Sequence, residues 1–221
     1  MSLGVYSISN VIAVSSNIAL YISGRNTNDT NASSGSVIIE CGNTAIGFMQ
    51  LMNDCYVSMS YLTIRSTSFS DALRSAQIDL FYLLNSKLQI SNVILEMMSR
   101  NLTAIFAGAH SSHRCNDLTI TGSVSGVVFH AHHCGQHEMY NLKMVGPITL
   151  YNNYAANSTP GSGVLFNAYG LGRYAIGNTI TTTGTITGKR YELILNSHLV
   201  GVSNVPNTTI AGALGSGSSV Q

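Results

Sequence analysis

Charge is scarce in this chain. Only 9% of its 221 residues are Asp, Glu, Lys or Arg, whereas roughly a quarter are charged in an ordinary soluble protein. A charge-poor surface must be hydrated by hydroxyls and amides, which favours a repetitive β protein over a charge-rich helical one. The net charge of +1 provides no basic field for nucleic acid and no polybasic membrane signal. We therefore expect a neutral partner, either glycan or protein.

Long apolar runs and cysteine motifs are also missing. No run reaches the roughly 18 to 20 residues that span a bilayer, so we expect no membrane insertion. Residues 1–4 lack the basic segment of a signal peptide and resemble an expression remnant, so we expect the chain to be part of a longer protein. The four cysteines form no C-x-x-C motif, which predicts reduced, buried thiols rather than a disulfide framework.

A short apolar-x-apolar segment recurs along the chain. Its copies begin at Val37, Leu62, Val93, Leu118 and Leu142, at spacings of 25, 31, 25 and 24 residues. A second series, Phe48, Phe81, Phe106 and Phe129, has spacings of 33, 25 and 23 residues. Both series contain one long step at the same place, which indicates an insertion within residues 66–76.

Two short strands in each repeat of about 24 residues predict an all-β fold, a right-handed parallel β-helix whose coils bury their apolar faces against neighbouring coils. The first and third residues of each segment are expected to face the core, and the middle residue to face outwards. The middle residue is apolar at Ile38 and Ile94, which suggests a face covered by a second copy of the chain.

Three charged residues follow consecutive segments at the same position. Glu40, Arg65 and Glu96 would lie about 4.8 Å apart along the stack and form an ionic ladder. Three independent solvated charges are the alternative, because exposed ion pairs contribute little stability.

The repeat weakens from Pro147 onwards. Residues 155–163 are rich in turn formers, and strand-like segments follow near residues 164–166, 179–187 and 191–195. We therefore expect a parallel β-helix over residues 1–146 and a distinct C-terminal β region over residues 147–221. This region would cap the stack or hold a trimer together, because a solenoid needs its last coil protected.

At this level of organisation the chain resembles the C-terminal parts of β-helical bacteriophage tailspikes and tail fibres. The resemblance includes Gly-Lys-Arg-Tyr at residues 188–191 and Val-Pro-Asn-Thr-Thr-Ile-Ala-Gly at residues 205–212. It implies a parallel homotrimer, located on the virion tail as part of a longer fibre. It also implies binding to a bacterial surface polysaccharide or an outer-membrane protein, and in some members endoglycosidase or lyase activity.

Acidic residues are the candidates for such an activity, because glycosidases use carboxylate pairs roughly 5 to 9.5 Å apart. Asp71 and Asp79 flank the insertion, and Asp117 is a third candidate. Glu96, Asp117 and Glu138 are evenly spaced, but each has a different position within its repeat. This difference argues against a column of stacked carboxylates and favours binding over catalysis.

Histidines gather in two neighbouring repeats, at positions 110, 113, 130, 132, 133 and 137. His130 and His132 would point to the same side of a strand, and three copies of the chain would present six imidazoles to one transition metal on a three-fold axis. The alternatives are hydrogen-bonded turn histidines without cofactor and a zinc site that includes Cys115 and Cys134.

Two segments are candidates for receptor binding. In the insertion, the Phe69 ring would stack on a sugar or an apolar patch while Asp71 and Arg74 supply hydrogen bonds. The second segment holds Tyr151, Asn152 and Tyr154, whose rings and amide suit glycan contact. The alternatives are a polar bulge and an ordinary turn. The sequence thus favours a receptor-binding module, with a polysaccharide depolymerase and a purely structural fibre segment as further hypotheses.

Overall fold

The computed structural model describes residues 4–24, 37–41, 47–66, 78–97, 102–122, 124–125, 128–152 and 159–221. Regular structure in these ranges is strand, apart from one 3-10 turn, η2 (Val202–Asn204). The all-β prediction is therefore confirmed. These ranges also hold no helix that is long and apolar enough to cross a membrane.

A long sheet of twelve strands runs through the whole molecule. Its main path consists of β1 (Gly4–Ile8), β4 (Val37–Cys41), β6 (Tyr56–Ser66), β8 (Lys87–Glu96), β10 (Ser112–Thr121), β13 (Gln136–Tyr140), β17 (Arg173–Ile176), β21 (His198–Val200) and β23 (Ser219–Val220). Beside this path, β3 (Ala19–Ser23) pairs with β6, and β14 (Lys143–Val145) pairs with β10 and with β18 (Thr181–Thr182).

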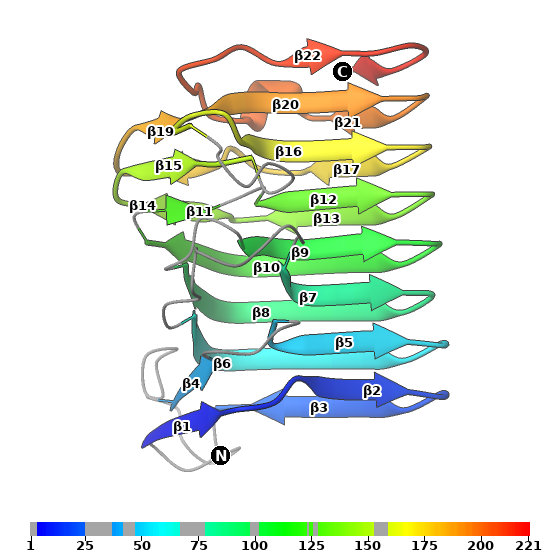
Figure 1. Ribbon diagram of the computed structural model, residues 1–221, viewed down its shortest axis with the longest axis vertical. Coiled ribbons are helices and arrows are strands. Elements are labelled where there is room, and N and C mark those ends of the chain that lie inside the picture. The colour runs from blue at the N-terminus through cyan, green and yellow to red at the C-terminus, as the bar shows by residue number, and fades with distance from the viewer. Residues whose placement is uncertain are drawn as a thin grey trace.

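Two further sheets complete the architecture. The eight-stranded sheet lies in front of the long sheet in Figure 1. It contains β2 (Ile12–Ser15), β5 (Met49–Met52), β7 (Ile78–Leu84), β9 (Leu102–Gly108), β12 (Phe129–His132), β16 (Val164–Tyr169), β20 (Lys189–Ile194) and β22 (Ala213–Leu214). The three-stranded sheet contains β11 (Val124–Ser125), β15 (Ile148–Leu150) and β19 (Ile186–Thr187).

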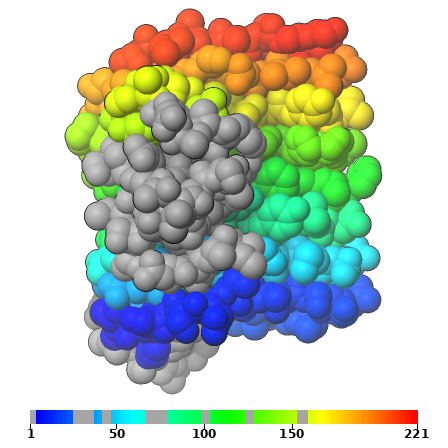
Figure 2. Space-filling model, in the orientation of Figure 1, coloured from blue at the N-terminus to red at the C-terminus, as the bar shows by residue number. Residues whose placement is uncertain are grey.

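The paired strands of all three sheets run parallel, and each interior strand pairs with strands one repeat before and one repeat after it. His113 on β10, for example, pairs with Leu88 on β8 and with His137 on β13. The layers therefore follow the order of the sequence, and the space-filling view shows them as successive bands (Figure 2).

The apolar-x-apolar segments pair in the predicted register. Ile64 on β6 pairs with Ile39 on β4 and with Leu95 on β8. The first and third residues of all five segments are buried in one core, as the alternation of a strand requires. The long step also falls where predicted, because the connection that spans it joins β6 to β7.

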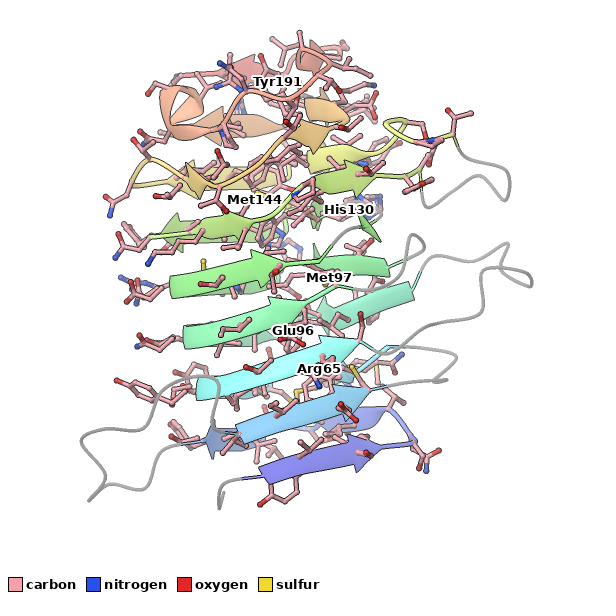
Figure 3. The ribbon with its side chains drawn as sticks, turned by 90° about the vertical axis from the view of Figure 1, so that its left-hand side faces the viewer. Arg65, Glu96, Met97, His130, Met144 and Tyr191 are labelled. Atoms are coloured by element: carbon pink, nitrogen blue, oxygen red, sulfur yellow. The ribbon has the colours of Figure 1, made fainter. Side chains whose placement is uncertain are left out.

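The charged residues that follow these segments form the predicted ladder. Arg65 donates from Nη1 to Oε1 of Glu40 at 2.9 Å and from Nε to Oε2 of Glu96. Figure 3 shows Arg65 and Glu96 on neighbouring strands. One guanidinium thus joins three consecutive layers of the long sheet, and the alternative of independent charges is wrong.

Tight turns join strands of the eight-stranded sheet to the strands that follow them in the long sheet. His133 and Cys134, between β12 and β13, have φ angles of 46° and 67°, in the left-handed region that non-glycine residues rarely occupy. Their turn hydrogen-bonds to its neighbour, because Cys134 N–H donates to the carbonyl of Gly170 at 3.0 Å. The turns therefore stack as regularly as the strands.

The phenylalanine series is only partly in register. Phe81 pairs with Ile105, which pairs with Phe129, and Phe129 pairs with Phe166. Phe106 is one residue away and lies outside the buried core cluster. The prediction of one shared register for this series is therefore wrong, because adjacent apolar residues at 105 and 106 made the facing residue ambiguous.

The same sheets continue across residue 147. β12 pairs with β16, and β13 pairs with β17. The two motif segments of the C-terminal part lie together: Gly188 N–H donates to Oγ1 of Thr209 at 2.9 Å, and Lys189 pairs with Ile210. The boundary and the capping or trimerising role of residues 147–221 remain predictions.

All four cysteines are thiols, as predicted. Cys41, Cys55 and Cys115 are buried and Cys134 is half-buried. Burial raises the pKa values of Cys41 and Cys115 to about 12, so both thiols stay protonated in the core.

Candidate functional site

Five aromatic side chains line the outer face of the eight-stranded sheet. On β12, Phe129 and Ala131 belong to the core, so the alternating His130 and His132 lie on the other side of the strand; His130 is only 5% exposed, whereas His132 is half-buried. The set, which we call the aromatic strip, consists of Tyr82 on β7, Phe106 on β9, His130 and His132 on β12, and Tyr169 on β16. The eight-stranded sheet is the front layer in Figure 1, and His130 lies in the upper half of the stack in Figure 3.

The rings of the strip contact one another from layer to layer. Tyr82 and Phe106 stack with centroids 5.0 Å apart and planes 6° apart. Phe106 meets His130 edge to face at 5.0 Å, and His132 stacks on Tyr169 at 5.0 Å and 18°. Both geometries are favourable for aromatic pairs. The strip is therefore a continuous aromatic path across four adjacent strands.

The strip is uncharged at neutral pH. Burial, with smaller contributions from the neighbouring His132 and His137, lowers the pKa of His130 to about 3. Burial, and then His133, also lower the pKa of His132. Burial raises the pKa of Tyr82, and nearby Asp79 adds to this shift. The imidazoles are therefore neutral and the Tyr82 phenol is protonated. The strip thus consists of uncharged rings and creates no strong electrostatic field.

Two buried histidines lie behind the strip in the core. His137 Nε2 is 3.0 Å from the carbonyl oxygen of His130, and only an N–H can make that bond. Burial lowers the pKa of His137 to about 4, so its Nδ1 carries no proton and accepts from Nδ1–H of His113 at 3.1 Å. His113 Nε2 is then a bare acceptor, and it finds no partner among the described residues.

Tyr174 fixes the same strand from behind. The N–H of Ala131 donates to Tyr174 Oη at 3.0 Å, and the hydroxyl is 2.7 Å from the carbonyl oxygen of Phe129. The Tyr174 ring also stacks on His137 at 5.1 Å. Together with the bond from His137 to the carbonyl of His130, buried side chains hold the backbone of three consecutive β12 residues. These hydrogen bonds therefore fix the backbone that carries the imidazoles of His130 and His132.

The predicted geometry of His130 and His132 is confirmed, but a metal cluster is not found. Their ring centroids lie 5.6 Å apart on one face of β12. The described residues contain no group of three or more His, Cys, Asp or Glu that could hold a metal ion. A metal shared between copies of the chain stays a prediction. His110 and His133 lie in turns, whereas the other four of the six clustered histidines lie on strands.

The predicted receptor residues are only partly visible. Phe69, Asp71, Arg74 and Tyr154 lie outside the described residues. Tyr151 and Asn152 follow β15 and are half-buried. The N–H of Asn152 donates to Oγ of Ser162 at 3.2 Å, which ties this segment to the residues that precede β16.

The candidate carboxylates within the described residues are kept apart by the fold. Asp79 lies on β7 of the eight-stranded sheet and is buried. Asp117 lies on β10 of the long sheet, at a bend where its φ is 57°. Asparagines hold the corresponding bends at Asn92 and Asn141, so Asp117 is explained by backbone geometry. The fold therefore gives no pair of described aspartates placed for acid–base work.

The strip went unpredicted apart from its two histidines. Phe106 belongs to the phenylalanine series found in the sequence, and no pattern considered there distinguishes Tyr82 or Tyr169. A usable signal exists: Tyr82, Phe106 and His130 each follow an inward Phe81, Ile105 and Phe129 by one residue. Reading that column one residue later would have placed aromatic rings at the same outward position in three consecutive layers.

Comparisons of the chain with protein-family models, with curated proteins and with solved structures found no significant match.

Proposed function

We propose that this chain is a saccharide-binding module that recognises a bacterial surface, and that the aromatic strip is its binding surface. The strip is the single observation that carries this proposal. Sugar rings have apolar C–H faces that pack on aromatic rings, while their hydroxyls need polar neighbours. Asn167 and Glu192 provide such groups, because they continue the outward column of His130 on β16 and β20.

Repeated layers make this surface suited to a polymer. Adjacent strands lie about 4.8 Å apart, so the strip offers rings at successive positions along the stack. A linear polysaccharide would contact the more accessible rings of Tyr82, Phe106, His132 and Tyr169, with the buried His130 behind them. The neutral imidazoles and the phenol favour an uncharged stretch of saccharide, because no charge would be left unpaired on binding.

For the whole assembly we propose a right-handed parallel β-helix that acts as a homotrimer in a phage tail fibre or tailspike. The chain passes alternately between the two large sheets with a repeat near 24 residues, and this path supports the proposed helical coil. Residues 147–221 would then cap the stack or hold the trimer. The residue 66–76 segment with Phe69, Asp71 and Arg74 remains a second proposed contact with a glycan or an outer-membrane protein.

Binding to an array of purified bacterial O-antigens and capsular polysaccharides tests the proposed function. Tyr169→Leu and Phe106→Leu remove a ring and keep apolar bulk, so each should weaken binding about tenfold, which corresponds to about 1.4 kcal/mol. Tyr21→Leu is the matched control, because Tyr21 is 72% exposed and lies on β3, away from the strip. Equal affinities for all three variants would contradict a role of the strip.

Sedimentation equilibrium tests the assembly separately. A mass three times that of the 23.5 kDa chain is expected at micromolar concentration. A monomer that still binds saccharide through the strip would refute the trimer and leave the binding site standing.

A further inference from the structure

A groove crosses the outer face of the long sheet near its C-terminal end, on strands other than those of the aromatic strip. Its volume is about 340 Å³. One wall is an outward column on four neighbouring strands, formed by Gln136, Arg173, His198 and Ser219. The opposite column runs from Glu138 through Ala175 to Val200. Ala175 ends at Cβ, so it leaves the hollow between its two larger neighbours.

The positive charge in this groove lacks a counter-charge. Among the described residues, no carboxylate or other side chain pairs with the exposed guanidinium of Arg173. Glu138 is the nearest acid by register, but its carboxylate faces Arg114, whose Nε lies 3.8 Å away. Arg173 therefore projects from β17 as an unpaired cation beside a hollow.

The other residues of this column carry hydrogen-bonding groups and lie on neighbouring strands of the long sheet. His198 follows Arg173 directly in the column, and its Nδ1 lies 2.8 Å from Oγ of Ser219, which orients the imidazole. Gln136 precedes Arg173 in the column. A guanidinium flanked by an amide and an imidazole matches the two oxygens of a carboxylate and the hydroxyls around it.

We propose that this groove binds the carboxylate of an acidic saccharide, with Arg173 as the ion-pairing residue and Ala175 as the floor that admits the sugar ring. The ligand class differs from that of the strip, which is uncharged. The chain would therefore hold neutral and acidic residues of a surface glycan on two different sheets.

Titration calorimetry with tetragalacturonate and with its fully methyl-esterified form tests the groove. The acid should bind, and the ester should bind at least tenfold more weakly. Raised salt should weaken the binding of the acid only. Arg173→Gln removes the charge and Ala175→Leu fills the hollow; each should reduce acid binding at least tenfold. Lys143→Gln, on β14 of the same sheet and outside the groove, should leave it unchanged.

Three outcomes would overturn the proposal. The first is unchanged acid binding in Arg173→Gln, and the second is equal binding of acid and ester. The third is loss of binding in Ala175→Leu together with a changed mass in sedimentation, which would make the groove an interface between copies of the chain. Tyr169→Leu should leave acid binding intact, so failure of the groove and failure of the strip are separable.

Discussion

His113 and His137 face each other in the core with their Nδ1 atoms 3.1 Å apart, and only His113 can be the donor. The direction follows from the carbonyl of His130, which demands a proton on His137 Nε2. Both imidazoles occupy a column that is otherwise apolar on neighbouring layers, with Leu88 before them and Tyr174 and Leu199 after them. A polar pair in this column links the core to the strand that carries the aromatic strip.

Stability should fall in mild acid because of this buried pair and His130. An unfolded histidine has a pKa near 6.5, whereas the folded values are about 4 for His137 and about 3 for His130. Between these values the unfolded chain binds more protons, so the free energy of unfolding decreases as the pH falls from about 6.5 towards 4. We expect a loss of a few kcal/mol, measured as urea midpoints at pH 7 and pH 5. His110→Gln, at an exposed turn histidine, should keep the full pH dependence, and a flat profile in the parent would contradict the prediction.

Single substitutions in the pair should have unequal effects. His137→Leu leaves the buried His113 Nδ1–H without an acceptor, which costs about 1 to 3 kcal/mol, and it also removes the bond from His137 Nε2 to the carbonyl of His130. His113→Leu leaves only Nδ1 of His137 and removes the unpartnered Nε2, so it should cost less. In urea unfolding, a double-mutant cycle should show coupling between the two sites. A larger loss for His113→Leu would reverse the deduced direction of the bond.

The Arg65 ladder should contribute modestly and in a salt-dependent way. Its side chains are 34%, 27% and 29% exposed, so solvent screens the attraction, and we expect Arg65→Met to cost about 1 kcal/mol or less. The loss should shrink in 1 M NaCl. Arg114→Met, in a longer and more exposed pair with Glu138, is the control and should change the urea midpoint little. A salt-independent loss would instead indicate lost packing of the arginine stem.

One turn carries avoidable strain. Leu171 has a φ of 66° and is 49% exposed, and the left-handed conformation costs a branched residue about 1 to 2 kcal/mol. Asn196 occupies the equivalent position in the next turn, with a φ of 59°. Leu171→Asn should therefore raise the free energy of unfolding by about 0.5 to 1 kcal/mol, measured in urea, whereas Leu171→Ala should give no such gain because the strain remains.

The register of the long sheet was predictable, because the repeated segments have unambiguous alternation. Leu62-Thr63-Ile64 and Leu118-Thr119-Ile120 each place a polar residue between two apolar ones, and this pattern allows only one facing. The same register predicts that Arg65 lies beside Glu96. Local patterns therefore sufficed wherever each strand had one polar and one apolar face.

The eight-stranded sheet was harder to predict because its outer face carries aromatic rings directly next to inward apolar residues. Ile105 and Phe106 are adjacent, and periodicity cannot decide which of them points inwards. His113 and His137 were ambiguous for the opposite reason, since a polar residue in a core column depends on partners far along the chain. Their partner atoms, such as the carbonyl of His130, become visible only when the layers are stacked.

The stacked turns have one further consequence, which concerns tolerance to insertion. Turns from the eight-stranded sheet to the long sheet hold a tight left-handed bend, as at Asn53 and Asp54 or at His133 and Cys134. Connections in the other direction differ in length: one spans residues 67–77 and the next spans residues 97–101. The connections along one edge of the molecule therefore keep a constant length, and the connections along the other edge vary in length. Foreign peptides grafted into the connection between β8 and β9, within residues 97–101, should therefore be displayed without shifting the strand pairing of any layer.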